Sequence, residues 1–83
     1  MLDQTLGDLI REEREAREWL QEDLARRMGV HTPTVSRWET GRRVVPNEAL
    51  NRLAEVFGWS EQRSADALRL AGLGNLIDST RAA

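Results

Sequence analysis

Apolar residues recur along the chain every three or four positions, the spacing that gathers side chains on one face of an α-helix. The clearest example is a stripe of four residues: Leu50, Leu53, Ala54 and Phe57. Two earlier segments carry shorter stripes: Leu6, Leu9 and Ile10, then Leu24, Ala25 and Met28. Together with a segment near residues 33–40 and one after residue 60, the pattern predicts an all-α fold of five helices without strands.

Capping residues and glycines mark the ends of these segments. Either Asp3 or Thr5 can cap the first predicted helix. Thr32 can cap the third, and Pro33 can occupy its first turn, where a missing N–H costs nothing. Glycines end the second, third and fourth helices, as C-terminal glycines commonly do: Gly29, Gly41 and Gly58.

The chain of eighty-three residues is long enough for one small domain, and we expect no separate effector-sensing domain. We assign residues 1–72 to this domain. Its last helix begins after a Ser60 cap and is expected to end near Ala71. Residues 73–83 form a C-terminal extension with some apolar residues but no firm pattern: Leu73, Leu76 and Ile77.

Several classes of protein are not supported by the composition. No stretch approaches the ~20 apolar residues of a membrane span, and the N-terminus lacks the basic and apolar parts of a signal peptide. We therefore expect a cytoplasmic protein. The absence of cysteine excludes disulfides and thiolate metal ligands.

Charge is distributed unevenly along the chain. The formal net charge is −2, yet residues 26–43 hold five arginines against one glutamate, a local charge of +4 that leaves −6 elsewhere. A positive face on an acidic body can bind phosphates while its non-specific binding stays weak. All twelve basic residues are arginine, whose planar fork suits phosphates and guanine edges, although GC-rich codon usage explains this bias equally well.

The segment from Gln21 to Gly41 combines a short helix, a tight turn at Gly29 and a second helix, which is the helix-turn-helix arrangement. At ~100° per residue, Val35 and Trp38 share one side of the second helix. The opposite side carries short polar residues and one long donor: Pro33, Ser36, Arg37 and Thr40. Small side chains let the backbone approach the major groove while the donor reaches base edges. This side therefore has the composition of a base-reading surface.

Residues 6–58 resemble the lambda-repressor-like (Xre-type) helix-turn-helix regulators, which include phage repressors and Cro proteins. The resemblance rests on residues at matching spacings: Leu6, Gly7, Ile10, Arg11, Arg14, Gln21, Leu24, Ala25, Gly29, Val30, Val35, Ser36, Arg37, Trp38, Glu39, Gly41 and Pro46. Each match alone is weak, but the combination is specific. It implies a five-helix domain that presents a recognition helix, from about Pro33 to Thr40, to the major groove of double-stranded DNA.

The resemblance also implies roles for individual positions. Four residues match positions that face base edges: Thr32, Pro33, Ser36 and Arg37. Three match positions that reach the DNA backbone: Thr40, Arg42 and Arg43. Gln21 either contacts a phosphate or hydrogen-bonds to the recognition helix. Arg14 and Glu39 match the family's partly buried ion pair.

The sequence departs from the family pattern at three positions. Glu18 stands where the family usually has glycine, and Leu20 stands where it has a Ser or Thr cap worth ~1 kcal/mol. Glu13 falls on the inward side of the first helix, where an apolar residue is expected. Because residues 8–28 contain no Gly, Pro or Ser, local propensity alone predicts one long helix there. The break that we place near Glu18–Leu20 follows from the family register.

Other conspicuous side chains are assigned simpler roles. Trp38 is predicted to lie in the core. The two other tryptophans stand at helix boundaries and are predicted to cover the edge of the core: Trp19 and Trp59. His31 is expected to be an exposed turn residue, with a phosphate contact as the alternative. Arg26 and Arg27 either clamp a phosphate or lie on an ordinary polar face.

We predict a transcriptional regulator, a repressor or Cro-like protein that binds an inverted repeat as a homodimer. Apolar residues of the fifth helix and the extension offer a dimer surface, although the fifth helix can instead close the core of the monomer: Ala65, Leu68, Leu73, Leu76 and Ile77. One alternative is an antitoxin whose residues 60–83 mask a toxin. Another is a module that uses the helix-turn-helix scaffold to bind a protein partner.

Enzymatic activity is not expected. The sequence shows no glycine-rich phosphate loop, no nucleophile paired with a base and no metal-ligand cluster. Its carboxylates lie among arginines, as in the run of Glu12, Glu13 and Glu15 beside Arg11 and Arg14, which is typical of surface pairs on a helix. We therefore predict neither a catalytic residue nor a metal or cofactor.

Overall fold

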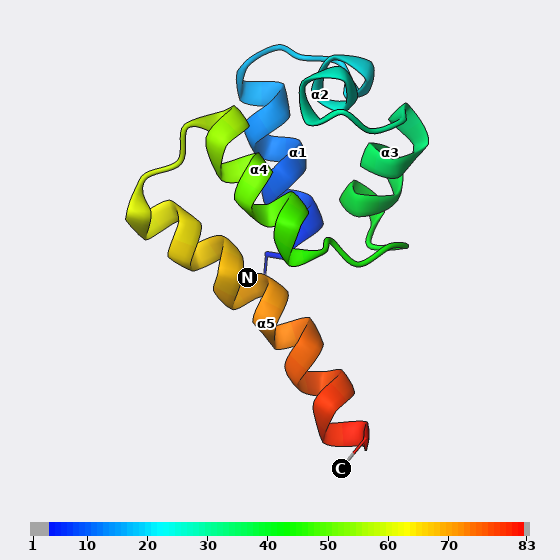
Figure 1. Cartoon of the computed structure of the whole chain (residues 1–83), viewed down its shortest axis with the longest axis vertical. Coiled ribbons are helices and arrows are strands. Elements are labelled where there is room, and N and C mark those ends of the chain that lie inside the picture. The colour runs from blue at the N-terminus through cyan, green and yellow to red at the C-terminus, as the bar shows by residue number, and fades with distance from the viewer. Residues whose placement is uncertain (1–3, 83) are drawn as a thin grey trace.

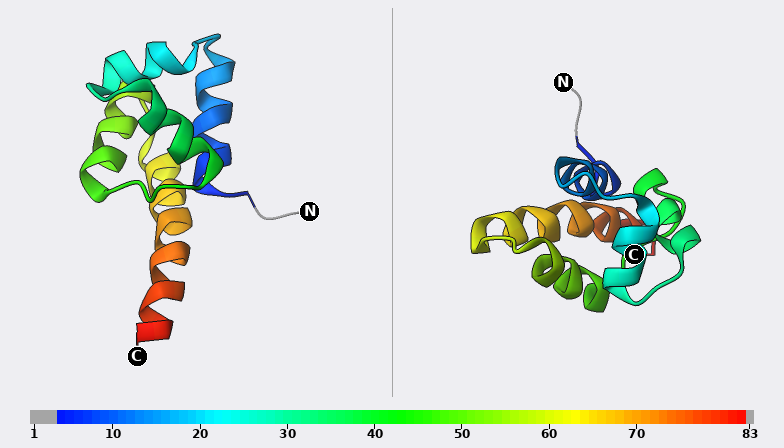
Figure 2. Two further views of the ribbon diagram at one scale, coloured as in Figure 1. Left: turned by 90° about the vertical axis from the view of Figure 1, so that its right-hand side faces the viewer. Right: turned by 90° about the horizontal axis from the view of Figure 1, so that it is seen from above.

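The computed structural model of the protein describes the backbone of residues 4–82 and the side chains of residues 4–72. Among these residues it contains five helices and no strand: α1 (Leu6–Ala16), α2 (Gln21–Met28), α3 (Thr32–Thr40), α4 (Asn47–Phe57) and α5 (Glu61–Ala82). The predicted all-α, five-helix fold is confirmed. Helices α1 to α4 form a body against which the first half of α5 packs, and the second half of α5 projects past it (Figures 1 and 2).

One hydrophobic core holds these helices together. Its largest fully buried side chains come from α1 to α4: Leu9, Ile10, Leu24, Val35 and Leu53. Trp38 is 3% exposed, which confirms its predicted place in the core. Helix α5 contributes the buried Ala67, and Leu70 and Ala71 pack against the core edge. The first half of α5 therefore closes the core of the monomer.

The first four helices end in the same way. A residue in the left-handed conformation is followed by a backbone N–H that donates to the carbonyl five residues earlier. Three of the left-handed residues are glycines: Gly29, Gly41 and Gly58. At the end of α1 the residue is Glu18, with φ of 60°, and the Trp19 N–H donates to the Arg14 carbonyl at 3.1 Å. The predicted break between α1 and α2 is confirmed, at a local cost of roughly 1–2 kcal/mol for a left-handed non-glycine residue.

Helix α2 begins without a hydroxyl cap, as expected from a leucine, Leu20, at the position where the family usually has Ser or Thr. Instead, the Leu20 backbone N–H donates to Asp23 Oδ2 at 2.8 Å. This backbone hydrogen bond is the main reason that the pKa of Asp23 lies below its ordinary value, and a hydrogen bond from Arg26 lowers it further. This bond satisfies the N–H of the cap residue itself, whereas the missing Ser or Thr hydroxyl would accept an N–H of the first turn. The Asp23 carboxylate is in addition favourably placed at the N-terminus of the helix.

Two predicted caps agree with the structure. Asp8 donates its backbone N–H to Thr5 Oγ1 at 3.0 Å, and Thr5 donates its own to Asp8 Oδ2 at 3.2 Å. The other candidate cap, Asp3, lies outside the described residues. At the start of α5, the Arg63 N–H donates to Ser60 Oγ at 3.1 Å.

Two predicted boundaries are wrong. Thr32 does not cap α3 but is its first helical residue, and His31 occupies the cap position without a side-chain hydrogen bond. Helix α5 does not end near Ala71 but continues to Ala82. Residues 73–83 lack an amphipathic pattern, so the hydrophobic periodicity did not predict that the helix continues into them.

Glu13, the charged residue on the inward side of α1, joins three helices. Arg17 donates to Glu13 Oε1 at 2.8 Å, and Arg63 of α5 donates to Oε2, also at 2.8 Å. Arg17 further donates to the Phe57 carbonyl at the end of α4 at 2.6 Å and lies 4.7 Å from the centre of the Phe57 ring. The charge at Glu13 is therefore a structural link among α1, α4 and α5.

We expect this link to make the fold sensitive to acid. Burial raises the pKa of Glu13, but the hydrogen bonds and charges of Arg17 and Arg63 outweigh it, so the pKa lies below its ordinary value of 4.5. Because the folded-state pKa is the lower one, the stabilisation is present above about pH 4.5 and is lost as the pH falls through the folded-state pKa. Glu13→Gln should therefore flatten the fall of the melting temperature below about pH 5.

The control for this experiment is Glu55→Gln, which removes an exposed carboxylate of α4 that makes no ion pair with the described residues. It should retain the acid dependence of the wild type. An unchanged acid dependence in Glu13→Gln would show that another group causes the loss of stability.

Candidate nucleic-acid interface

Helix α3 packs its inward side against α1 and α2 and exposes its outer side. Val35 and Trp38 are buried, as is the carboxylate residue Glu39. Three of the four predicted base-reading residues are exposed and Ser36 is half-buried: Thr32, Pro33, Ser36 and Arg37. The structure thus brings these four residues together on one nine-residue helix, on a side that α1 and α2 do not cover.

Gly7 allows α1 to approach the end of α3 at backbone distance. A Cβ atom at this position would lie 2.5 Å from the Glu39 carbonyl oxygen and 2.6 Å from that of Trp38. These atoms belong to the backbone and can yield only if α3 itself shifts. Gly7 therefore helps to set the position of the recognition helix on the body.

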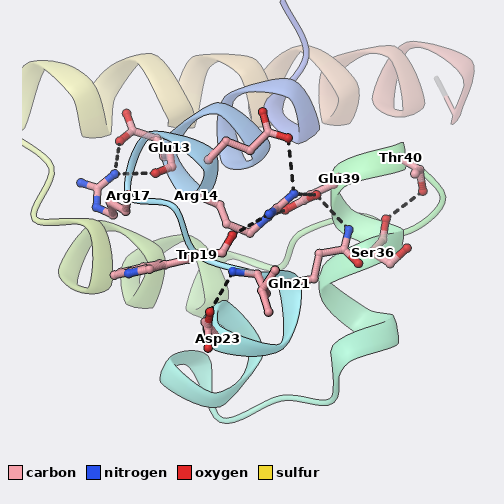
Figure 3. Close-up of polar contacts among 11 residues, drawn as sticks. Glu13, Arg14, Arg17, Trp19, Gln21, Asp23, Ser36, Glu39 and Thr40 are labelled. Carbon is pink, nitrogen blue, oxygen red and sulfur yellow. Dashed lines mark hydrogen bonds and ion pairs between the residues drawn. The ribbon is translucent and has the colours of Figure 1, made fainter.

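A hydrogen-bond network around Glu39 ties α3 to α1 and α2 (Figure 3). The Glu39 side chain is 2% exposed. Its Oε2 accepts from Arg14 Nε at 2.7 Å, and its Oε1 accepts from Arg14 Nη2 at 3.1 Å and from Gln21 Nε2 at 3.0 Å. Arg14 also donates to the Trp19 carbonyl at 2.8 Å. The hydrogen bonds to Glu39 raise the pKa of Arg14, so the guanidinium stays charged.

Two of the predicted DNA-backbone residues make hydrogen bonds within the domain. Gln21 donates to Glu39, which is the second of the two roles considered for it. Thr40 donates its hydroxyl hydrogen to the Ser36 carbonyl at 2.9 Å (Figure 3). Since a phosphate can only accept, Thr40 would have to turn its hydroxyl away from the helix to bind one.

The arginines fall into two groups. Among the described side chains, six lie within 4 Å of a carboxylate: Arg11, Arg14, Arg17, Arg26, Arg63 and Arg69. Five have no such partner within residues 4–72: Arg27, Arg37, Arg42, Arg43 and Arg52. Arg27 lies 4.2 Å from the centre of the Trp19 ring. The other four belong to α3, the loop after it and α4, so positive charge without a carboxylate partner among the described side chains gathers around α3.

The remaining candidates serve the fold. Arg26 pairs with Asp23 at 2.8 Å, and Arg27 stacks on Trp19, which favours the polar-face interpretation of both. Trp19 stacks on Phe57 with ring centres 5.8 Å apart. The ring centre of Trp59 lies 5.6 Å from that of Phe57, and both tryptophans pack against the core. The predicted role of the two boundary tryptophans as covers of the core edge is confirmed.

Sequence reasoning missed Arg52. On the sequence it is one polar residue of the fourth helix. The fold places it on the same cleft as His31 of the turn and Arg43 of the loop after α3. These residues are widely separated along the chain, so no local spacing predicts their meeting.

Neither a metal cluster nor a membrane helix is found in the part of the chain that the structure describes. No three His, Asp or Glu side chains gather there as metal ligands would. None of its helices is both long and apolar enough to cross a bilayer.

Comparison with known proteins agrees with this arrangement. A family model described as a helix-turn-helix domain matches residues 5–68, from the cap of α1 into the first turns of α5. No curated protein and no solved structure matches the chain significantly. The family match covers most of the chain and includes every residue of the exposed α3 surface. The chain therefore belongs to the helix-turn-helix family of DNA-binding domains.

Proposed function

We propose that the protein is a sequence-specific transcriptional regulator of the Xre type, a repressor or Cro-like protein of the cytoplasm. It binds an inverted repeat in duplex DNA as a homodimer, with α3 in the major groove. The observation that carries this proposal is the gathering around α3 of three arginines that have no carboxylate partner among the described side chains: Arg37 on the helix, and Arg42 and Arg43 directly after it.

In this proposal the outer side of α3 reads bases and the surrounding groups bind phosphates. The base-reading residues are Thr32, Pro33, Ser36 and Arg37, and the backbone ligands are Arg42 and Arg43, with Gln21 and Thr40 at the edges of the contact. The ion pair of Arg14 and Glu39 holds α3 at its docking angle and does not itself contact DNA. Phosphate contacts supply affinity, while base contacts supply selectivity.

The dimer is supported by the exposed side of α5. Ala67 faces the core, whereas Ala65 and Leu68 are exposed, Leu68 at 54%. Beyond them α5 projects from the body (Figure 2), and its sequence there includes Leu73, Leu76 and Ile77. A two-fold pairing of these helices would place two copies of α3 ~34 Å apart, one helical turn of DNA.

The proposal is tested by selecting bound sequences from a random duplex pool at fixed salt, followed by sedimentation of the free protein. We expect a consensus with two-fold symmetry, affinity that falls steeply with salt, and a dimer in solution. A non-symmetric site together with a monomer at high concentration would rule out the dimer. Failure to select any duplex would favour a module that binds a protein partner.

A further inference from the structure

A cleft of about 460 Å³ lies between the turn before α3, one flank of α3 and the N-terminal half of α4. Three basic side chains from separate segments line it: His31 of the turn, Arg43 of the loop after α3, and Arg52 of α4. Thr34 adds a hydroxyl from α3. The fold thus gathers these four side chains and the acidic Glu48 around one hollow, and none of the five belongs to the predicted base-reading set.

The two arginines on this cleft form no ion pair with the residues that the structure describes. Arg43 and Arg52 are exposed, and neither has a carboxylate of the described residues within 4 Å. Glu48, also exposed, is the acidic residue of the lining and makes no ion pair with either. Guanidinium groups present paired donors that match the oxygens of a phosphate. The charged side of the cleft therefore suits a phosphate better than a cation.

The position of the cleft relates it to the outer side of α3. Thr34 and Trp38, one turn apart on α3, line it, while Pro33 and Arg37 are exposed directly beside them. The cleft consequently borders the proposed base-reading surface along the flank that faces α4. When α3 lies in a major groove, the sugar-phosphate strand at the edge of that groove passes along this flank.

We propose that this cleft binds a backbone phosphate of the DNA strand on the α4 side of the recognition helix, with Arg52 as its main donor. The inference rests on the proposed function and extends the contact beyond Arg42 and Arg43 to α4. Arg52 adds affinity without reading sequence, because a phosphate is the same at every base pair. Glu48 opposes the contact and limits its strength.

The test compares wild type, Arg52→Gln and the control Arg11→Gln on the selected operator over a range of salt concentrations. Arg11 is an exposed arginine of α1 that pairs with Asp8 and belongs to neither the proposed DNA contact nor the proposed dimer surface, so both variants lose one positive charge. Loss of one phosphate contact should lower the salt slope by about 0.9 for each protomer and the affinity by about eightfold for each half-site at roughly 0.1 M salt. Arg11→Gln should match the wild type, and the consensus should be unchanged in both variants.

Two further measurements sharpen the assignment. Glu48→Gln should strengthen binding, the opposite direction to Arg52→Gln. Neutral methylphosphonate substitutions along the duplex should identify one phosphate per half-site whose replacement weakens the wild type but not Arg52→Gln. Thermal unfolding with inorganic phosphate or chloride at equal ionic strength should show no stabilisation that depends on Arg52; such stabilisation would instead assign the cleft to free phosphate.

The outcomes separate this inference from the proposed function. If Arg52→Gln melts like the wild type and binds with the wild-type salt slope, the cleft is not a phosphate site, and the proposed function stands. If the wild type itself shows no salt-dependent binding to duplex DNA, both fail.

Discussion

Glu39→Ala is expected to lower the free energy of unfolding by about 3–5 kcal/mol, the cost of leaving a buried charge without its partner. The Glu39 side chain is 2% exposed and that of Arg14 is 11% exposed. Removing Glu39 deprives two Arg14 nitrogens and the Gln21 amide of their acceptor. Because these donors come from α1 and α2, the change should loosen the attachment of the recognition helix to both. Urea unfolding, followed by tryptophan fluorescence, measures the effect.

A second carboxylate beside the Arg14 guanidinium supplies a matched control. Arg14 also lies 3.8 Å from Glu15, whose side chain is 61% exposed. An exposed pair of this kind is worth under about 1 kcal/mol, so Glu15→Ala should unfold nearly as the wild type does. If Glu39→Ala and Glu15→Ala had equal, small effects, the Glu39 pair would be as well solvated as an exposed one.

The placement of this pair illustrates what can be read from the sequence and why. Arg14 and Glu39 are 25 residues apart, so neither helical spacing nor composition links them. The resemblance to the family linked them, because the matched positions in that family reflect how α1 packs against α3. The same register placed the break near Glu18–Leu20, where propensity favours a continuous helix, and in the structure the left-handed backbone of Glu18 ends α1.

Contacts that neither local spacing nor the resemblance to the family implies were not predicted from the sequence. Glu13 stood out as a charge on an inward face, and its link to Arg17 follows i, i+4 spacing. Its second partner, Arg63, is 50 residues away on α5, and this contact depends on how α5 returns across α1. The cleft around Arg52 is of the same kind, since it joins a turn, a loop and a helix.

The helix boundaries also divide into those that the local sequence predicts and those that it does not. Gly29, Gly41 and Gly58 ended their helices as predicted, because the left-handed conformation is a local property of glycine. The start of α3 was misjudged by one residue because a threonine in the first turn of a helix resembles a cap in sequence. The length of α5 was misjudged because residues 73–83 carry no amphipathic pattern from which a helix could be predicted.

Arg37→Ala is expected to cost about 1–3 kcal/mol per half-site and to relax the preference at one base pair. Arg37 is exposed on the outer side of α3 and has no carboxylate partner among the described residues. It is also the one long donor among the outer residues of this helix. Its fork can donate to guanine O6 and N7 together, the commonest specific contact in the major groove. Binding to the operator and to variants changed at single base pairs measures the effect.

Comparison with Arg43→Ala separates base-specific recognition from sequence-independent phosphate binding. Arg43 lies in the loop after α3, where we propose that it binds a phosphate. Its loss should weaken all sequences alike and lower the salt slope by about one per protomer, while the selected consensus stays the same. Arg37→Ala should instead change the consensus and weaken the operator more than random duplex. If Arg37→Ala weakened operator and random duplex equally and left the consensus unchanged, Arg37 would be a phosphate ligand and the outer side of α3 would not be the reading surface.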